Sequence, residues 1–431
     1  MSSSRSRRQF LHYSTGVAAL ALADGCAPRP RPGGVRAATL TSGVIAAAQP
    51  APSDRVIKPT SSLYFVTREP GAEEMIWGEA KYYEDTVPNA RFYVHSRVRP
   101  PSVDPQTWQL EILGSAIGRP RTFTYAQLQA MPQVTLRRVI DCGANCRAFF
   151  PRLPQKARGW LPIGFTQWHF GAVGAAEWTG VRLKDLLEAA GLDGATDVMF
   201  TGLDVIPTGD GAVARYAQVI PIQKVLESDT LLALRMNGEP LPVDHGWPAR
   251  VIFSGWGGNT AVKWVGRIEA SKQKLPYPTF QDRQVISGPD IAEPYRPTVG
   301  HVRSAMELHE DTTFMPGDIV LRGRAWSGAG AIDRVDLSIE RLVAPNTWRP
   351  VWSPAWRQAQ LLGKPESMMW TRFELEWPRV EPGRYRVMSR ARDAAGNTQP
   401  RPEDVVWNQQ GLGYNGHAPL ELAVLPPTMM P

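Results

Sequence analysis

The stretch V-I-D-C-G-A-N-C-R, from Val139 to Arg147, lies between two apolar-rich segments and has Cys142 at its centre. A cysteine thiolate is a soft, strong ligand for a transition metal. The Gly-Ala-Asn turn after Cys142 offers backbone N–H donors and Arg147 offers a guanidinium, and both kinds of donor suit a phosphate or another anion. The stretch therefore predicts a metal-binding cysteine beside a site for an anionic cofactor.

The composition is that of a soluble globular protein with room for two or three domains, at 431 residues, 43% of them hydrophobic and 21% charged. The net charge of +7 comes from dispersed basic residues without a polybasic run beyond the N-terminus, so nucleic acid is not an expected partner. Such a surface suits an anionic substrate or an acidic electron-transfer partner. Fifteen tryptophans and 39 prolines indicate a protein rich in strands and loops. Three cysteines permit at most one disulfide.

The first residues have the features of an export leader. S-R-R-Q-F-L, Ser6 to Leu11, matches a twin-arginine signal, and the apolar stretch from Gly16 to Ala23 is too short to span a bilayer. We expect residues 1–50 to form a signal peptide and linker, and the protein to be periplasmic. The A-D-G-C sequence ending at Cys26 also fits a lipoprotein cleavage box, and only lipid on Cys26 would place the protein at a membrane.

Two stretches of the next region predict local structure. Thr124 to Met131 indicates a short helix with a threonine cap. E-W-T-G-V-R-L-K-D-L-L, Glu177 to Leu187, indicates a turn followed by an amphipathic helix whose leucines face the core. His169, beside a glycine-rich turn, is expected to be a hydrogen-bonded structural histidine rather than a proton donor.

The segment M-N-G-E-P-L-P-V-D-H-G-W-P-A-R, Met236 to Arg250, begins with an Asn-Gly pair typical of a tight hairpin and is followed by V-K-W at Val262 to Trp264. His245, Arg250 and Lys263 supply donors of the kind that a phosphate and the edge of a heterocycle require. Any one of them alone would fit a surface cation beside a hairpin. The three at this spacing favour a binding site.

From about Ile291 the sequence changes to short strands of period two, among them Ile319 to Gly328, Arg334 to Ile339 and Gly383 to Ala391. This pattern is typical of an immunoglobulin-like sandwich of about 130 residues. The predicted fold class is α+β. A catalytic domain of mixed sheets and short helices is expected over residues 51–290, and an all-β sandwich over residues 291–431.

Together these segments resemble the sulfite oxidase family over residues 88–425. The Cys142 stretch is similar to the family's D/E-C-x-G-N-x-R segment, with the glycine and alanine in swapped order, and Met236 to Trp264 matches the M-N-G-x-P-L-P-x-D-H-G-x-P-x-R and V-K-W segments. In the family's R-F-F-V-R-N-H segment the last three residues are replaced here by His95, Ser96 and Arg97. The resemblance implies a molybdenum–molybdopterin cofactor (Moco), oxygen-atom transfer, and a homodimer formed through the C-terminal domain.

The resemblance also implies roles for individual residues. Cys142 would be the metal ligand. The catalytic residues would be Cys142, His95, Arg97 and Arg147. The residues expected to bind the cofactor are Phe92, His95, Ser96, Arg97, Cys142, Asp204, His245, Arg250 and Lys263.

Several alternatives stay open at this point. An oxidising periplasm would permit a Cys142–Cys146 disulfide, although cofactor loading before export favours ligation. The function could be oxidation of a small sulfur compound, reduction of a sulfoxide or N-oxide, or binding without a cofactor. The chain has no C-x-x-C-H haem motif and no iron–sulfur cysteine cluster, so the expected electron acceptor is an external carrier such as a c-type cytochrome, or a quinone.

Sulfite itself is a poor candidate for the small-molecule substrate. By the resemblance, the family holds this dianion with an arginine at the place of His95 and with a tyrosine about two dozen residues beyond V-K-W. This chain has T-F-Q-D-R-Q, Thr279 to Gln284, in the second region. A histidine is neutral for much of its time near pH 7, although Arg97 or Arg283 could restore the charge. Fewer fixed cations favour a neutral or singly charged substrate.

Overall fold

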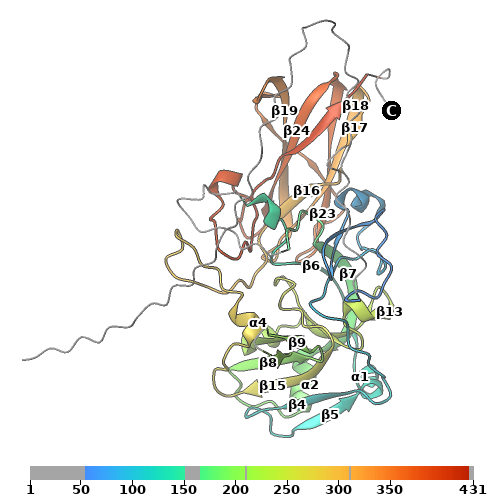
Figure 1. Cartoon of the computed structure of the whole chain (residues 1–431), viewed down its shortest axis with the longest axis vertical. Helices are drawn as coiled ribbons and strands as arrows, with labels where there is room; N and C mark the ends of the chain where they lie inside the picture. Colours follow the sequence, from blue (N-terminus) through green and yellow to red (C-terminus); the bar gives the residue numbers. More distant parts are fainter. Residues whose placement is uncertain (1–53, 151–165, 209–210, 310–311, 427–431) are drawn as a thin grey trace, which may run out of the picture. The chain divides into compact units, whose positions relative to one another are not determined.

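The structure is a computed structural model, and it describes residues 54–150, 166–208, 211–309 and 312–426. The leader from Ser6 to Leu11 and Cys26 lie outside these residues, so export, lipidation and the 1–50 boundary stay predictions. The regular elements of the described residues are mostly strands, with a few short helices, as the composition predicts (Figure 1). None of the helices in this part of the chain is long and apolar enough to cross a membrane.

A five-stranded sheet of order β11-β8-β15-β4-β5 packs with α1 and α2 around one apolar core. Its pairs are antiparallel except for β15 with β4, which run parallel, so the sheet is mixed as predicted. The strands are β4 (Gln109–Leu113), β5 (Arg121–Thr124), β8 (Asp197–Gly202), β11 (Ala217–Pro221) and β15 (Val265–Ser271).

A second sheet, of order β13-β12-β7-β6 with β14 also paired to β12, carries the Cys142 stretch. Strands β6 and β7 are antiparallel and end with Asp141 opposite Val173. Cys142 therefore directly follows the last residue of β6. The strands are β6 (Val134–Asp141), β7 (Val173–Arg182), β12 (Thr230–Met236), β13 (Glu239–Pro240) and β14 (Arg250–Phe253).

Shorter elements complete this part of the chain. The small strands are β1 (Phe65–Glu69), β2 (Ala72–Met75), β3 (Val94–His95), β9 (Ile206–Pro207) and β10 (Val213–Ala214). The α-helices are α1 (Tyr125–Ala130), α2 (Leu183–Ala189), α3 (Ile222–Val225) and α4 (Thr279–Asp282). The 3-10 turns are η1 (Trp77–Tyr82), η2 (Arg147–Phe149), η3 (Val243–His245) and η4 (Pro402–Asp404).

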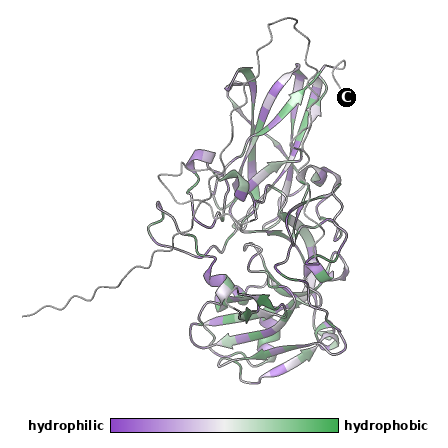
Figure 2. Cartoon of the chain, in the orientation of Figure 1, coloured by the Kyte–Doolittle hydropathy of each residue, from purple (hydrophilic) through white to green (hydrophobic). Residues whose placement is uncertain are grey.

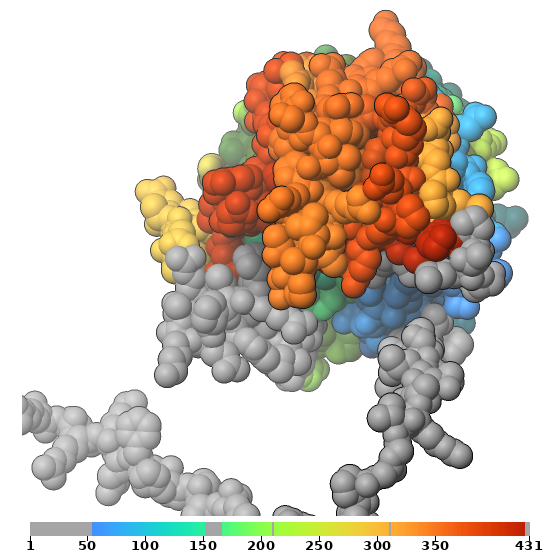
Figure 3. Space-filling model, turned by 90° about the horizontal axis from the view of Figure 1, so that it is seen from above, coloured from blue at the N-terminus to red at the C-terminus, as the bar shows by residue number. Residues whose placement is uncertain are grey.

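From β16 onward the described chain forms two sheets around a shared core, one of order β16-β18-β23-β22 and one of order β17-β25-β24-β19-β20 with β21 paired to β19. Hydrophilic and hydrophobic residues mix along these strands (Figure 2), which cover the face seen from above in Figure 3. This arrangement is consistent with a sandwich, and its immunoglobulin-like type stays a prediction. The strands are β16 (Arg303–Met306), β17 (Thr313–Phe314), β18 (Gly317–Trp326), β19 (Ile332–Ala344), β20 (Thr347–Pro350), β21 (Trp356–Gln358), β22 (Gln360–Leu362), β23 (Thr371–Val380), β24 (Gly383–Asp393) and β25 (Leu420–Val424).

Local sequence signals predicted several elements correctly. Thr124 caps α1 through a capping box, in which its hydroxyl accepts from the Gln127 N–H at 3.2 Å and the Gln127 side chain accepts from the Thr124 N–H at 2.8 Å. Asn237 and Gly238 have φ of 52° and 79° in the turn between β12 and β13. These positive values are those that Asn-Gly pairs supply, which confirms the predicted hairpin.

Candidate functional site

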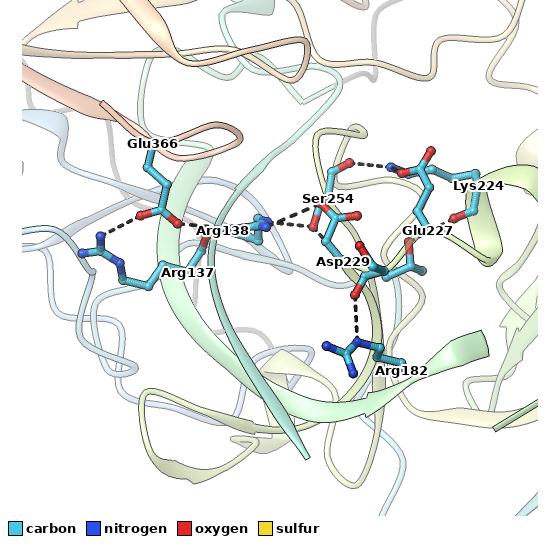
Figure 4. A network of polar contacts seen from close by, with 10 residues as sticks. Arg137, Arg138, Arg182, Lys224, Glu227, Asp229, Ser254 and Glu366 are labelled. Atoms are coloured by element: carbon cyan, nitrogen blue, oxygen red, sulfur yellow. Dashed lines mark hydrogen bonds and ion pairs between the residues drawn. The ribbon is translucent and has the colours of Figure 1, made fainter. Parts of the chain in front are cut away.

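A polar network fixes the outer edge of β6, the strand that leads to Cys142. Arg138 donates to the Ser254 hydroxyl at 2.8 Å, and its side chain is only 11% exposed. Arg137 and Arg138 both reach Glu366, at 2.7 and 3.5 Å (Figure 4). The Met368 carbonyl accepts an N–H of the same strand at 3.1 Å. The loop before β23 therefore pairs with β6, and the C-terminal part of the chain helps to set where the strand ends.

Cys142 begins a tight turn, and its own backbone groups bond within the turn and to the residue that precedes β7. Its N–H donates to the Ala172 carbonyl at 2.9 Å, and its carbonyl accepts from the Asn145 N–H at 2.8 Å. Cys146 then takes the left-handed conformation, with φ of 66°, before η2. The side chains of residues 142 and 146 thus leave the turn in different surroundings.

The turn also contacts distant parts of the chain. The Gly143 carbonyl accepts from the Gly413 N–H at 2.8 Å. A Cβ on Gly143 would stand 3.2 Å from the side-chain oxygen of Asn259, which is a tight contact. The glycine in the place directly after Cys142 therefore leaves room for this amide, which gives the swapped Gly143-Ala144 order a physical reason.

The two described cysteines are free thiols in different environments. Burial raises the pKa of both. At Cys142 the N–H of Ala144 and the guanidinium of Arg147 oppose this rise and favour the thiolate. Cys146 packs in an apolar cluster with Trp407. Of the two, Cys142 has the electrostatic support that a metal ligand needs.

His169 has structural surroundings, in line with its predicted role. Its carbonyl accepts from the Cys146 N–H at 2.7 Å, and its ring centroid lies 5.3 Å from that of Phe149. It is not among the residues that line the cavity next to Cys142.

Cys142 faces a cavity of about 480 Å³. All ten residues that the sequence singled out line this cavity, although they are scattered between positions 92 and 263. They are Phe92, His95, Ser96, Arg97, Cys142, Arg147, Asp204, His245, Arg250 and Lys263. Their roles towards a cofactor stay predictions, but the predicted cluster itself is present.

Basic side chains gather at one end of the cavity. The Lys263 ammonium donates to the Ser96 hydroxyl at 2.9 Å and to the carbonyls of Asp244 and His95 at 2.9 and 3.2 Å. Arg250 donates to the His245 carbonyl at 3.3 Å. Burial, with the neighbouring cations, lowers the pKa of Lys263 to about 7 and that of His245 well below its usual value. A bound anion would relieve this repulsion.

Lys58 joins this group from the N-terminal side, and the sequence did not indicate it. Its ammonium lies 3.3 Å from His245 Nε2 and also donates to the Phe92 carbonyl. The backbone N–H groups of Ile57 and Lys58 donate to the two carboxylate oxygens of Asp244 at 2.9 and 2.7 Å. Burial lowers the pKa of Lys58 to about 7. We call Lys58, His245, Arg250 and Lys263 the basic cradle.

Two charged side chains of the cavity lining have a buried polar atom without a hydrogen-bond partner in the described chain, Arg250 Nε and Asp204 Oδ1, and the buried Trp168 Nε1 of the lining is unpaired as well. Burial raises the pKa of the Asp204 carboxyl to about 6. Buried polar atoms are nearly always paired, so these two indicate a ligand with both acceptors and donors. A phosphate-bearing pterin with a metal next to Cys142 fits this donor set.

The three other predicted catalytic residues, His95, Arg97 and Arg147, also line the cavity and differ in burial. Burial lowers the pKa of His95 to about 3, so this side chain is neutral at physiological pH, and its ring lies 5.5 Å from that of Trp168. Arg147 donates to the Gly411 and Thr166 carbonyls at 3.1 and 3.0 Å and stays charged, although burial lowers its pKa to about 10. Arg97 is exposed.

A neutral wall faces these cations, and the sequence interpretation missed it. The Tyr216 hydroxyl donates to the Asn259 carbonyl at 2.7 Å and accepts from the amides of Gln218 and Gln284, each at 3.1 Å. The Asn259 amide in turn donates to Gln284 at 2.8 Å. Thr279 to Gln284 has no tyrosine, as noted from the sequence, but Tyr216, which directly precedes β11, supplies a hydroxyl from another part of the chain. Gln409 and Gln410 complete the lining, with Tyr93, from the far ends of the chain.

The matches to known protein families fall on two parts of the chain, one that contains most of the predicted cavity residues and one that contains the C-terminal sheets. The family description "Oxidoreductase molybdopterin binding domain" matches residues 96–279, and "Mo-co oxidoreductase dimerisation domain" matches residues 299–418. Sulfite oxidase of Gallus gallus is 30% identical over 346 residues, which cover 75% of this chain and 70% of that protein. The chain belongs to the sulfite oxidase family.

Other members of the family are similar over shorter shares of their length. Mitochondrial sulfite oxidase of Mus musculus is 28% identical over 359 residues, which cover 79% of this chain and 62% of that protein. The chain thus spans less than two thirds of this relative. The crystal structure of the sulfane dehydrogenase SoxCD from Paracoccus pantotrophus has a TM-score of 0.66 over 84% of each chain at 24% identity, which shows a shared fold.

Family membership identifies the cofactor of this site as molybdenum with molybdopterin. The matched binding domain begins at Ser96 and includes every predicted site residue except Phe92 and His95. Those two residues lie just upstream and line the same cavity.

Proposed function

We propose that this protein is an exported molybdenum enzyme that carries out oxygen-atom transfer at a small sulfur compound other than sulfite. It passes the electrons to an external carrier such as a c-type cytochrome. The observation that carries the proposal is one cavity whose lining combines three features, namely Cys142, the His245, Arg250 and Lys263 side chains of the basic cradle, and a set of neutral amides. The first two features serve the cofactor, and the third distinguishes the substrate.

In this proposal Cys142 binds molybdenum, and His245, Arg250 and Lys263 hold the phosphate and the pterin edge through charge-assisted hydrogen bonds. Asp204 accepts a hydrogen bond from the ligand through its unpaired oxygen. When bound, the cofactor supplies the oxygen-atom transfer and the two-electron chemistry. The chain itself binds and orients the substrate and excludes water from the cavity. It also holds Arg147 charged beside Cys142.

The substrate side has one buried, fixed cation, Arg147, where the family resemblance implies two arginines. His95 is neutral, and Arg97 and Arg283 are exposed at the opening, where water screens their charge. The remaining polar lining includes amides such as Gln284 and Gln410, and the Glu69 carboxylate, whose charge acts on Arg147. Neutral donors and one cation suit a neutral or singly charged sulfur compound better than a dianion.

The homodimer belongs to the same proposal. Residues 299–418 match a dimerisation domain, and symmetric pairing is the usual arrangement of soluble oligomers. We propose that residues 291–431 provide the contact. Contacts between this part and the Cys142 turn, such as the Gly413–Gly143 hydrogen bond, would then connect the dimer to the site.

The decisive experiment is analysis of molybdenum and pterin in the exported protein, followed by turnover assays in both directions. We expect one molybdenum per chain, and reduction of cytochrome c with a small organic sulfur compound that is neutral or singly charged. Faster turnover with a sulfoxide and a reduced viologen would reverse the assigned direction. A chain without molybdenum and pterin would instead be a binding protein, and the proposal would be wrong.

A further inference from the structure

Tyr93 places a phenol ring in the wall of the cavity. The residue is 7% exposed, and its ring stacks on Phe92 with centroids 5.4 Å apart. On another side it meets Trp168 edge-on at 6.3 Å. These contacts leave the ring one orientation, so the position of its hydroxyl is set by packing.

The hydroxyl lies between the two ends of the cavity. Its oxygen would be 3.0 Å from a Cβ on Gly258, so the glycine there makes room for it. The N–H of Gly258 donates to the carbonyl of Asp141 at 2.7 Å, which ties this glycine to the residue before Cys142. Tyr93 also interacts electrostatically with Cys142 and with Arg250, which stand at the thiol end and the basic end.

The Tyr93 hydroxyl makes no hydrogen bond within the described residues. Tyr216, the other tyrosine of the lining, is the opposite case, since its hydroxyl makes one donated and two accepted bonds. The Tyr93 oxygen is not one of the fully buried unpaired atoms, so it borders the open space of the cavity, where it can donate to a bound group. Burial also raises the pKa of Tyr93 well above its usual value, so the phenol keeps its proton.

We propose that Tyr93 is a cofactor-binding residue, whose hydroxyl donates a hydrogen bond to the organic part of the cofactor between Cys142 and Arg250. The inference rests on the proposed function and adds to it. The family segment has phenylalanine at this place, so the contact would be a feature of this chain. Tyr216 is assigned to the substrate wall instead, because its hydroxyl is already committed to protein groups.

The test compares Tyr93→Phe with Tyr216→Phe, a matched change that removes the same atom from the other tyrosine. Both loaded proteins are diluted, and the molybdenum and pterin kept by the chain are measured over time. We expect Tyr93→Phe to lose the cofactor about tenfold faster, the usual effect of one neutral hydrogen bond, and to shift the visible absorption of the loaded protein. Tyr216→Phe should retain the cofactor like the wild type and change the KM for substrate.

Circular dichroism and urea unfolding of the cofactor-free variants show whether each still folds. Equal retention and equal spectra for Tyr93→Phe and the wild type would overturn this inference and leave the proposed function intact. Faster loss from Tyr216→Phe alone would also overturn it. Absence of molybdenum and pterin from the wild-type chain would overturn the proposed function and this inference together.

Discussion

Arg303 of β16 forms a buried ion pair with Asp141, the residue that directly precedes Cys142. The same carboxylate oxygen accepts from the Trp326 indole at 3.0 Å, and Arg303 also donates to the Tyr414 carbonyl at 2.8 Å. Both Arg303 and Trp326 belong to the C-terminal sheets. The part of the chain that matches a dimerisation domain therefore also holds the residue next to Cys142, the predicted metal ligand.

Replacing Arg303 by Met leaves the Asp141 carboxylate buried without its cation. Removing one partner of a buried pair typically costs about 3–5 kcal/mol, and we expect a loss of this size in urea unfolding, together with lower molybdenum content. Arg322→Met is the matched control, because its pair with Glu374 is exposed and such pairs contribute about 0–1 kcal/mol. Equal losses of stability and of molybdenum in the two variants would contradict the role assigned to the Arg303–Asp141 pair. The double variant Asp141→Asn with Arg303→Met should recover part of the loss.

The two cysteines should differ in their effect on metal content. Cys142→Ser is expected to lose molybdenum, because it removes the thiolate that faces the cavity. Cys146→Ala should keep the metal, since Cys146 lies in the apolar cluster with Trp407, and should cost only about 1 kcal/mol of stability as a small packing loss. Metal analysis of the two purified variants decides between them. Retention by Cys142→Ser with loss by Cys146→Ala would reverse the ligand assignment.

The basic cradle predicts how stability depends on pH. In the folded, cofactor-free chain the pKa values of Lys58 and Lys263 are about 7, whereas an unfolded lysine titrates near 10.5. Between these values the unfolded chain binds more protons, so stability should rise from pH 7 to pH 9. The slope is at most about 1.4 kcal/mol per pH unit for each lysine. Urea unfolding of the cofactor-free protein measures it, and Lys263→Met should reduce the slope.

The pH dependence of stability can be compared between the cofactor-free and the cofactor-loaded protein. An anion in the cradle favours charged lysines and so should flatten the dependence. A loaded protein whose stability still rises from pH 7 to pH 9 by the same amount would show that no anion lies beside Lys58 and Lys263.

Sulfite should be a poor substrate of the wild-type protein, and the His95→Arg variant should have a lower KM for sulfite. One charge-assisted contact contributes about 1.5–3 kcal/mol, which corresponds to one to two decades in KM for the dianion. The added guanidinium would lie among the cations Arg97, Arg147 and Lys263, which repel it. The gain in affinity is therefore expected only with the sulfite dianion bound. A sulfite titration with cytochrome c as acceptor compares the two proteins. Wild-type turnover of tens per second with a micromolar KM would mean that Arg97 or Arg283 already provides the charge.

The dimer prediction needs only the mass of the mature protein in solution. Light scattering at micromolar concentration should give about twice the chain mass. A monomer under these conditions would remove the proposed role of residues 291–431 in assembly.

The features that the sequence predicted best are those that depend only on residues close together along the chain. The Thr124 capping box and the Asn237-Gly238 turn were predictable because each is decided within four residues. The ten cavity residues were found because motif segments around Cys142 and Met236–Trp264 resemble those of a family. Lys58 and Gln410 were missed because only folding brings Lys58 beside His245 and Gln410 to the cavity lining. Tyr93 was missed although it adjoins Phe92, because the family segment has phenylalanine at this place. Tyr216 was missed because the tyrosine was sought along the chain after Lys263 rather than across the sheet.

The carboxylate of Asp244 receives the N–H groups of Ile57 and Lys58, and this links the N-terminal segment to the basic cradle. In the cofactor-free protein, repulsion among the cations of the basic cradle weakens the binding of this N-terminal segment to the rest of the chain. A bound anion in the cradle strengthens this binding. The peptide bond after Arg55 should therefore be cut quickly by trypsin in the cofactor-free protein and slowly in the loaded one. Proteases that survey newly made chains would then remove empty molecules at their N-terminal end and spare filled ones.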